Sequence, residues 1–358
     1  MTLPSSIILN SKQISSVDIQ ALAIEKNANP IVPVWEKELF QFLNEWFSEQ
    51  DFIPAQTSGS TGEPKPIKLP KTTMIKSAER TIEYFGLKKS DQLLLSLSCQ
   101  YIAGKMMVVR AIVGQMNLIT VDPASDFARL EKESFDFGAM VPNQVFKLLE
   151  QPSGKEKLQH IRNLLVGGSG ISSALEAQIS QLSNRVVSTY GMTETASHIA
   201  IRELSGDRKS EYYNCLPGLS VSTNESGCLQ IHLPELNEPL QTNDLAELES
   251  NSCFKILGRI DSVIISGGIK YSPEIIEKKL ELLIDRRFVI SSLPDEKLGE
   301  KLVLVIEGNP FETIRLATKL AELLTAYQQP KKICFLEHFP ETNSGKIVRT
   351  EVKQLLLN

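Results

Sequence analysis

The sequence of 358 residues lacks several features that would decide its class at once. It has only five cysteines, none in a Cys-x-x-Cys pair, and its four histidines are scattered, so neither a disulfide framework nor a zinc site is expected. No run approaches the roughly 20 apolar residues of a membrane span. Residues 1–10 lack the basic start and apolar core of a signal peptide. We therefore expect a cytoplasmic protein without membrane insertion.

The chain also lacks a basic excess. It has 38 Lys and Arg residues against 43 Asp and Glu residues, for a net charge of −5. A protein held mainly by nucleic-acid phosphates would usually be basic, so no nucleic-acid partner is expected. Its content of 42% hydrophobic and 23% charged residues is typical of a globular protein, and its length allows roughly two or three domains.

Strand-like and helix-like segments alternate along the first part of the chain. The predicted strands are 93–97, 118–121, 137–141, 161–166 and 185–189, and the predicted helices are 35–47, 72–85, 102–115, 171–182 and one that begins at Pro142. This alternation indicates an α/β fold with a largely parallel sheet. Ligand-binding residues are then expected just beyond the carboxyl ends of the strands.

The second part of the chain has a different pattern. Residues 218–260 hold short strand-like runs between Gly, Asn, Pro and Glu, which indicates a β-rich subdomain. After Asp261 the alternation returns, with helices predicted at 273–283 and 311–325 and strands near 287–291 and 301–306. We therefore place a domain boundary at Asp261, with a large domain at 1–260 and a small α+β domain at 261–358.

The most informative segment is a loop rich in glycine and hydroxyl groups, Thr57-Ser58-Gly59-Ser60-Thr61-Gly62-Glu63-Pro64-Lys65. Its glycines allow backbone N–H groups to approach a ligand closely, and N–H and hydroxyl donors can then converge on one anion. Lys65 adds a positive charge. The loop is not a Walker A motif, because no Gly-Lys-Ser/Thr follows at the required spacing. A flexible linker is the alternative interpretation.

Two further segments follow predicted strands. After strand 185–189, Tyr190 offers a ring for stacking, Thr193 a hydroxyl group, and Glu194 an oxygen ligand of the kind that Mg²⁺ prefers. A capped turn would also explain this segment. The run Gly167–Gly170 follows strand 161–166, and by itself it indicates only that the chain turns.

Three charged segments occur later in the chain, at 242–244, 258–261 and 340–349. The first two place Asp244, Arg259 and Asp261 near turns, where surface charge alone would explain them. In the third, Lys346 lies between a glycine and a short apolar run. An exposed surface lysine is the common explanation for such a residue.

Taken together, in this order and spacing, the segments resemble the adenylate-forming superfamily of acyl-CoA synthetases, peptide-synthetase adenylation domains and luciferases. The resemblance runs from about residue 55 to residue 350, through loop 57–65, segment 190–195, Asp244, residues 259–261 with 266–268, and Lys346. It implies a large N-terminal α/β domain with a β-rich subdomain and a small, mobile C-terminal α+β domain.

The resemblance implies a role for each segment of the large domain. Thr57, Ser58, Gly59, Ser60, Thr61, Gly62 and Lys65 would grip the β- and γ-phosphates of ATP. Gly168, Ser169, Tyr190, Gly191 and Met192 would line the nucleotide site, with Gly168, Ser169 and Tyr190 beside the adenine and acyl pockets. Thr193 would contact the α-phosphate and Glu194 would hold Mg²⁺.

The resemblance also implies roles for residues near the predicted boundary and beyond it. Asp244 and Arg259 would bind the ribose hydroxyls, and Asp261 would be the hinge of the small domain. Lys346 would bridge the carboxylate and the α-phosphate during adenylation. After a rotation of the small domain, Gly267 and Gly268 would face the tunnel that admits a thiol.

The implied reaction has two halves. A carboxylate attacks the α-phosphorus of Mg·ATP, giving an acyl-adenylate and pyrophosphate, and a thiol, expected to be coenzyme A, then displaces AMP. Because the carboxylate and the phosphate are both anionic, the first half depends mainly on positioning and charge neutralisation.

The sequence departs from the family pattern at two places. Only 56 residues precede the phosphate loop, where relatives carry more, so a face of the domain would be reduced or covered by a partner, for example in a homo-oligomer. At the position of the family's aromatic or histidine gate stands Tyr101, which cannot act as a histidine at neutral pH.

The acyl group is suggested by a closer similarity. Segment 193–198 and the compact length are similar to a branch of acyl-CoA ligases whose acid is a dicarboxylate. The second carboxylate needs a cation or donor, and Lys105 or Arg110, in the otherwise apolar segment 102–116, would supply it with Ser197 or His198. The alternative is that both basic side chains extend to the helix ends.

Three other functions remain open at this point. The chain could be another acyl- or aryl-CoA ligase, or an adenylation enzyme that loads a carrier protein. It could also be a non-catalytic nucleotide-binding regulator on the same scaffold. The joint presence of Lys65, Glu194 and Lys346 favours an enzyme.

Overall fold

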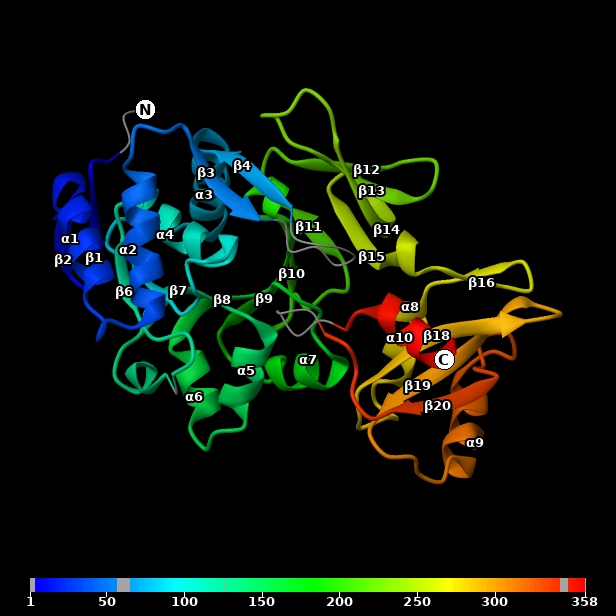
Figure 1. Cartoon of the computed structure of the whole chain (residues 1–358). Coiled ribbons are helices and arrows are strands. Elements are labelled where there is room, and N and C mark those ends of the chain that lie inside the picture. The colour runs from blue at the N-terminus through cyan, green and yellow to red at the C-terminus, as the bar shows by residue number, and fades with distance from the viewer. Residues whose placement is uncertain (1–3, 57–64, 126, 342–346, 358) are drawn as a thin grey trace. The chain divides into compact units, whose positions relative to one another are not determined.

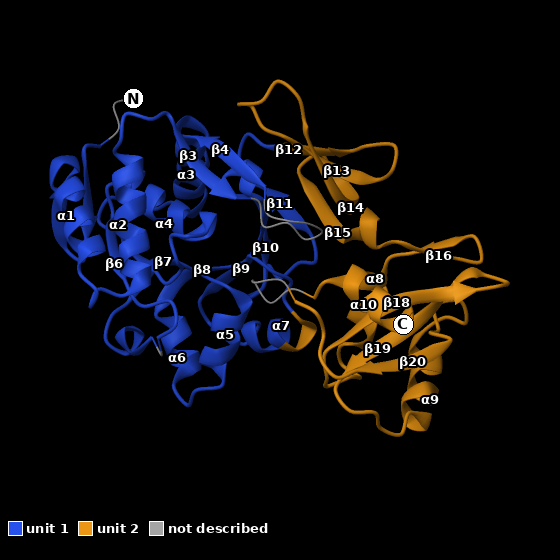
Figure 2. Cartoon of the chain, viewed as in Figure 1, with its two compact units in different colours: residues 1–59, 63–171, 175–219 blue, residues 60–62, 172–174, 220–358 orange. Residues whose placement is uncertain are grey.

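The computed structural model describes residues 4–56, 65–125, 127–341 and 347–357 (Figure 1). The chain forms two compact units, the first within residues 1–219 and the second made mainly of residues 220–358 (Figure 2). The predicted site residues 57–62 and Lys346 lie outside the described residues. None of the described helices combines the length and hydropathy that a membrane crossing needs.

The first unit is built on a mixed sheet with a parallel centre, in the order β2-β1-β6-β5-β7-β8-β9-β10-β11. Its strands are β1 (Ser6–Leu9), β2 (Lys12–Ser15), β5 (Gln92–Leu95), β6 (Asn117–Thr120), β7 (Phe135–Met140), β8 (Ile161–Val166), β9 (Arg185–Gly191), β10 (His198–Glu203) and β11 (Tyr213–Cys215). Neighbouring strands pair in parallel along the run β1-β6-β5-β7-β8-β9. At the two sides of this run, β2, β10 and β11 pair antiparallel. The predicted α/β fold with a largely parallel sheet is confirmed.

Within the described residues of this part of the chain there are seven α-helices. They are α1 (Ser16–Ala28), α2 (Val34–Trp46), α3 (Lys71–Phe85), α4 (Ile102–Gly114), α5 (Pro142–Leu149), α6 (Gly154–Gln159) and α7 (Ser173–Ile179). In Figure 1, α3 and α4 lie on one side of the strands and α5 and α6 on the other. Gly86 ends α3 with φ of 60°, and Pro142 begins α5, as the sequence predicts.

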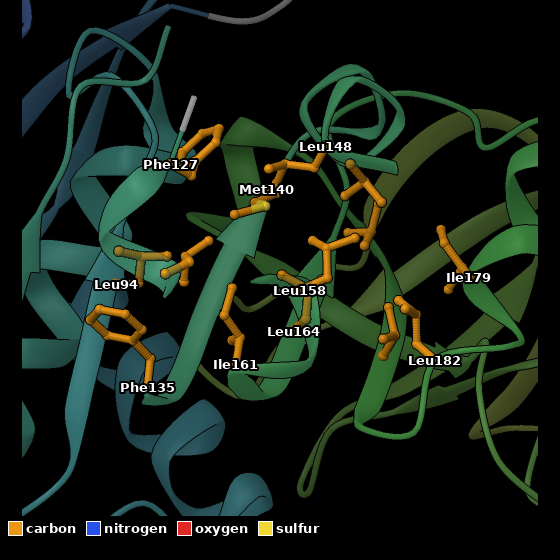
Figure 3. Packing of buried hydrophobic residues seen from close by; sticks show 14 of the residues in the cluster. Leu94, Phe127, Phe135, Met140, Leu148, Leu158, Ile161, Leu164, Ile179 and Leu182 are labelled. Carbon is orange, nitrogen blue, oxygen red and sulfur yellow. The ribbon is translucent and has the colours of Figure 1, made fainter. Parts of the chain in front are cut away.

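The hydrophobic core of the first unit lies between the parallel strands and helices α5–α7. Figure 3 shows Leu94, Phe135, Met140 and Leu164 from the strands and Leu148 from α5, which all belong to this one buried cluster. On the other side, α4 is buried along most of its length. Its Gly104 passes so close to the backbone that a Cβ there would lie 2.2 Å from the Ser98 carbonyl oxygen. A helix buried all round must place any charged side chain in the interior, and α4 carries Lys105 and Arg110 there.

A separate two-stranded hairpin carries the predicted phosphate loop. Strands β3 (Phe52–Gln56) and β4 (Pro66–Pro70) pair antiparallel, with Gln56 opposite Pro66 at the loop end. Lys65 is exposed and directly precedes β4.

The second unit begins with an antiparallel meander of β12 (Ser220–Thr223), β13 (Cys228–His232), β14 (Leu240–Ser250) and β15 (Cys253–Arg259). The β-rich prediction for 218–260 is therefore confirmed. A smaller α+β region follows, with β16 (Ile264–Ser266), β17 (Ile269–Tyr271), α8 (Pro273–Leu280), β18 (Phe288–Asp295), β19 (Gly299–Glu307), α9 (Ile314–Leu323), β20 (Lys332–Leu336) and α10 (Arg349–Leu357).

The compact units divide at Ser220, so the meander groups with the C-terminal residues. The sequence places its boundary later, at Asp261, and the hinge there stays a prediction. Short elements such as β16, β17 and β20 escaped the sequence pattern because three to five residues are too few to display a period.

Candidate active site

The turn between β9 and β10 organises the site in the first unit. Gly191 lies opposite His198, and a Cβ on Gly191 would lie 2.4 Å from the Ser197 carbonyl oxygen, so only glycine fits. Thr195 Oγ1 donates to the Ser197 carbonyl at 2.6 Å and accepts from the Met192 N–H at 3.0 Å. Ala196 takes a left-handed conformation with φ of 61°, which is strained for a residue with a side chain. The turn is therefore held in one specific shape.

Thr193 and Glu194 occupy a short 3₁₀ helix in this turn, η2 (Thr193–Thr195). Thr193 is buried, and its hydroxyl donates to the carbonyl oxygen of Gln56 at 3.4 Å. Gln56 ends β3 and is the last described residue before the predicted phosphate loop. Glu194 is half-buried. The structure thus brings the 190–195 segment to the root of the 57–65 loop.

The end of the neighbouring strand β8 reaches the same edge of the sheet. A Cβ on Gly167 would lie 2.0 Å from Thr189 Oγ1 of β9, and Gly168 has φ of 91°. Ser169 is exposed. Tyr190 is half-buried, with its ring centroid 5.8 Å from that of Tyr213. Gly168, Ser169 and Tyr190 therefore lie at the carboxyl ends of adjacent parallel strands, where an α/β sheet binds its ligands.

Arg110 is the centre of a buried polar cluster. It is 2% exposed, and its Nη2 donates to Ser197 Oγ at 2.5 Å and to His198 Nδ1 at 3.4 Å. Because a guanidinium can only donate, Nδ1 must accept and the His198 proton belongs on Nε2, which faces Thr81 Oγ1 at 3.4 Å. The Thr81 hydroxyl donates its own hydrogen bond to the Ser77 carbonyl at 3.0 Å. The cluster is consistent with a neutral imidazole.

No carboxylate is recorded as a partner of Arg110 among the described residues, and its Nε has no hydrogen-bond partner there. Burial lowers the pKa of Arg110 to about 9. Burial, followed by the charge of Arg110, holds the pKa of His198 well below its ordinary value. A buried cation of this kind is costly unless an anion reaches it.

Lys105 has a different environment from Arg110, although both lie on α4. Its Nζ donates to the carbonyl oxygen of Pro54 at 3.0 Å and lies 5.6 Å from the centre of the Phe42 ring. Burial lowers the pKa of Lys105, and the charge of Glu45 partly opposes this. Tyr101, immediately before α4, is 57% exposed.

The predicted ribose-binding residues come together in the second unit. Arg259 donates from Nε and Nη2 to the two carboxylate oxygens of Asp261 at 2.9 and 2.8 Å, and its Nη1 lies 3.3 Å from Asp244. Burial favours a higher pKa for Asp261, but the hydrogen bonds and charge of Arg259 outweigh it and the pKa is lowered. Asp244 and Arg259 are opposite each other on β14 and β15.

Gly267 and Gly268 form the two-residue turn between β16 and β17. Their φ values are 57° and 81°, and Ser266 pairs with Ile269 on either side. Left-handed φ at both positions defines the mirror-image turn that matches the twist of a hairpin and favours glycine. Their predicted place in a thiol tunnel stays a prediction.

Thr81, the partner of His198, was not predicted from the sequence. A signal was present, since Ser77 and Thr81 place two hydroxyls at i and i+4 on the buried face of α3. Within the described ranges no group of three or more His, Cys, Asp or Glu residues could hold a metal ion. Glu194 would be a single protein ligand, which suits Mg²⁺ because this ion is usually held by one or two carboxylates and by phosphate oxygens.

These features define an α/β fold whose candidate site residues gather at the carboxyl ends of the parallel strands. The AMP-binding enzyme family matches residues 48–225. A crystal structure of an acyl-CoA synthetase (AMP-forming)/AMP-acid ligase II-like protein from Dyadobacter fermentans is 35% identical, with a TM-score of 0.61, over 93% of this chain and 97% of that one. The chain therefore belongs to the AMP-binding enzyme family, and the predicted adenylate-forming fold and enzyme class are confirmed.

The chain is also similar to proteins at lower sequence identity. A 2-succinylbenzoate–CoA ligase of Lactococcus lactis is 25% identical over 326 residues, which are 85% of this chain and 71% of that protein. An o-succinylbenzoate CoA synthetase from Bacillus subtilis, solved with its acyl-adenylate intermediate, is 20% identical with a TM-score of 0.73, over 96% of this chain and 82% of that one.

Proposed function

We propose that the protein is an ATP-dependent acid–thiol ligase that converts o-succinylbenzoate to its coenzyme A thioester, a reaction of menaquinone biosynthesis. Support comes from the family, from the 2-succinylbenzoate–CoA ligases among its relatives, and from the chemistry of the Arg110 cluster. We place the reaction in the cytoplasm. A partner that covers the short N-terminal region stays a prediction from the sequence.

The observation that carries the choice of acid is the buried Arg110, which has no carboxylate partner among the described residues. o-Succinylbenzoate has two carboxylates, of which one is activated. The ring carboxylate would accept from Arg110, with Ser197 and the neutral His198 holding the guanidinium in place. Lys105, the other candidate from the sequence, already donates to Pro54. Arg110 is therefore our choice for the second carboxylate.

The residues around the strand ends would perform the first half-reaction. The loop 57–65 with Lys65 would hold the β- and γ-phosphates, Thr193 the α-phosphate, and Tyr190 with Gly191 and Met192 the rest of the nucleotide. A carboxylate oxygen of the acid attacks the α-phosphorus and pyrophosphate leaves. Glu194 would hold Mg²⁺, which supplies charge neutralisation at the phosphates. Lys346 would neutralise the charge that develops on the attacking and α-phosphate oxygens.

The second half-reaction would transfer the acyl group. The sulfur of coenzyme A attacks the acyl carbonyl, the thiol proton is lost, and AMP leaves with the electron pair of the C–O bond. Asp244 and Arg259 would hold the ribose, and rotation about Asp261 would bring Gly267 and Gly268 to the thiol.

A test with two readouts decides the proposal. ATP–pyrophosphate exchange with a panel of carboxylates measures the first half, and thioester formation with free coenzyme A measures the second. We expect o-succinylbenzoate to support both. Exchange without a thioester would indicate an enzyme that loads a carrier protein, and AMP binding without exchange with any acid would indicate a regulator. Either result would contradict the proposal.

A further inference from the structure

The hairpin of β3 and β4 contains prolines at alternate pairs. Its register joins Phe52 with Pro70, Pro54 with Lys68, and Gln56 with Pro66. Proline has no N–H group, and in an antiparallel pair it is accommodated where that group would point away from the partner strand. At such a pair the carbonyl group also points away from the partner strand. Pro54 and Gln56 lie at pairs of this kind, so their carbonyl groups face the outer edge of β3, away from β4.

Two buried side chains from distant parts of the chain hydrogen-bond to this outer edge. Lys105 Nζ of α4 donates to the Pro54 carbonyl at 3.0 Å, and Thr193 Oγ1 donates to the Gln56 carbonyl at 3.4 Å. The two residues are 9% and 6% exposed. Side chains therefore contact the outer edge of β3 at Pro54 and Gln56, just before the chain continues into loop 57–65.

The charge of Lys105 needs a reason, because an apolar side chain would be less costly to bury in α4. Its Nζ contacts the Pro54 carbonyl oxygen and the Phe42 ring, and it interacts electrostatically with Glu45 and Cys99. A hydrogen bond from a charged donor is roughly twice as strong as one between neutral groups. The ammonium group of Lys105 therefore fixes the backbone carbonyl of Pro54, three residues before the loop begins at residue 57.

We infer that Lys105 is a positioning residue for the nucleotide. By fixing Pro54 it holds β3 so that Gln56 meets Thr193 and the phosphate loop starts from a defined point. This inference rests on the proposed function, since the loop's role in binding phosphate comes from there. It gives Lys105 a role separate from that of Arg110: its loss weakens the binding of ATP and leaves the binding of the acid unchanged.

The chain offers a matched control in Lys71. This lysine is also buried, at 8% exposure, and its Nζ donates to a backbone carbonyl, that of Ser48, at 2.8 Å. It follows Pro70 at the opposite end of the hairpin from the loop. Lys71→Met therefore removes a buried ammonium and its carbonyl contact without touching the loop end.

The test compares Michaelis constants in ATP–pyrophosphate exchange. Lys105→Met is expected to raise the KM for Mg·ATP about tenfold, the loss of one charge-assisted hydrogen bond, with the KM for the acid within about twofold. Lys105→Arg, which keeps a charged donor, is expected to recover most of the loss. Lys71→Met is expected to leave both constants unchanged. An equal rise in Lys71→Met, or a rise in the KM for the acid in Lys105→Met, would overturn the inference.

A second readout does not depend on activity. Amide hydrogen exchange in peptides covering residues 51–56 is expected to be faster in Lys105→Met than in the wild type, and unchanged exchange there would overturn the inference. If the wild type shows no turnover with any acid, the proposed function fails while this readout still decides the role of Lys105. Lys105→Gln, whose shorter side chain withdraws the donor from Pro54, serves the same test if the methionine variant does not fold.

Discussion

Two buried arginines of the first unit, Arg110 and Arg202, have opposite environments. Arg202 on β10 donates from Nη1 and Nη2 to the two carboxylate oxygens of Glu176 at 2.9 and 2.8 Å. Burial favours a lower pKa for Arg202, but Glu176 and Tyr213 outweigh it and the pKa is raised. Burial lowers the pKa of Arg110 to about 9, and its recorded partners are neutral. An arginine that has its own carboxylate stabilises the fold, whereas one that lacks it is suited to bind an anionic ligand.

The largest effect is expected at the paired arginine. Arg202→Met removes the guanidinium from the Glu176 carboxylate, and breaking a buried ion pair in this way costs about 3–5 kcal/mol in the free energy of unfolding. The KM for the acid should not change. Denaturant unfolding with parallel kinetics checks both. If Arg202→Met raised the KM for the acid as much as Arg110→Met, the two arginines would not differ as we describe.

Arg110→Met is expected to show the reverse pattern. Removing a buried cation that lacks a carboxylate partner should leave the stability unchanged or slightly higher, because its desolvation is no longer needed. The kcat/KM for o-succinylbenzoate should fall about 100-fold, since a charge-assisted contact to the ring carboxylate is lost. Exchange kinetics and thermal unfolding measure the two effects. A large loss of stability with unchanged kcat/KM would assign Arg110 to the fold instead.

The lowered pKa of Arg110 predicts a pH dependence. Because burial lowers the pKa of Arg110 to about 9, the charged share of the guanidinium decreases as the pH rises past this value, and kcat/KM for the acid in the exchange assay is expected to fall with it. The contribution to stability has the opposite sign: a base whose folded pKa is lowered binds fewer protons than in the unfolded chain, so stability rises with pH above 9. The profile of Arg110→Met should lack this step, and an identical step there would contradict the assignment.

The smallest effect is expected at the more exposed pair of Asp261 and Arg259. The lowered pKa of Asp261 contributes stability above its unfolded pKa, and this contribution is lost as the pH falls through the folded pKa. Because solvent screens the pair, Asp261→Asn is expected to lower the free energy of unfolding by less than about 1 kcal/mol at neutral pH, and by a smaller amount in acid. Unfolding at neutral and acid pH measures this difference. A cost that grows in acid would exclude this linkage.

Much of the fold followed from local patterns in the sequence. The segments that follow strands 161–166 and 185–189 contain glycines and Glu194. From these segments we predicted where ligand-binding residues gather, because hydrophobic periodicity and turn residues are local properties of a sequence. The partners of Thr193 and His198 were not predictable in this way. Gln56 lies 137 residues from Thr193 and Thr81 lies 117 residues from His198, and only the packed tertiary structure brings each pair together.

The sequence alone shows that the two basic residues of α4 point in different directions. Lys105 and Arg110 are five positions apart, which on a helix separates their directions by about 140°. They therefore face different directions, so only one of these two predicted alternatives can face the second carboxylate. Our choice between them rests on their contacts in the structure, since Lys105 donates to the Pro54 carbonyl and Arg110 to Ser197.

The most direct test of the account is the ratio of kcat/KM for o-succinylbenzoate to that for 4-oxo-4-phenylbutanoate, the same acid without its ring carboxylate, in the exchange assay. We predict a ratio of about 100 for the wild type, the value of one charge-assisted contact, and a ratio near one for Arg110→Met. A wild-type ratio near one, or a ratio that Arg110→Met leaves unchanged, would contradict the claim that this buried arginine selects the acid.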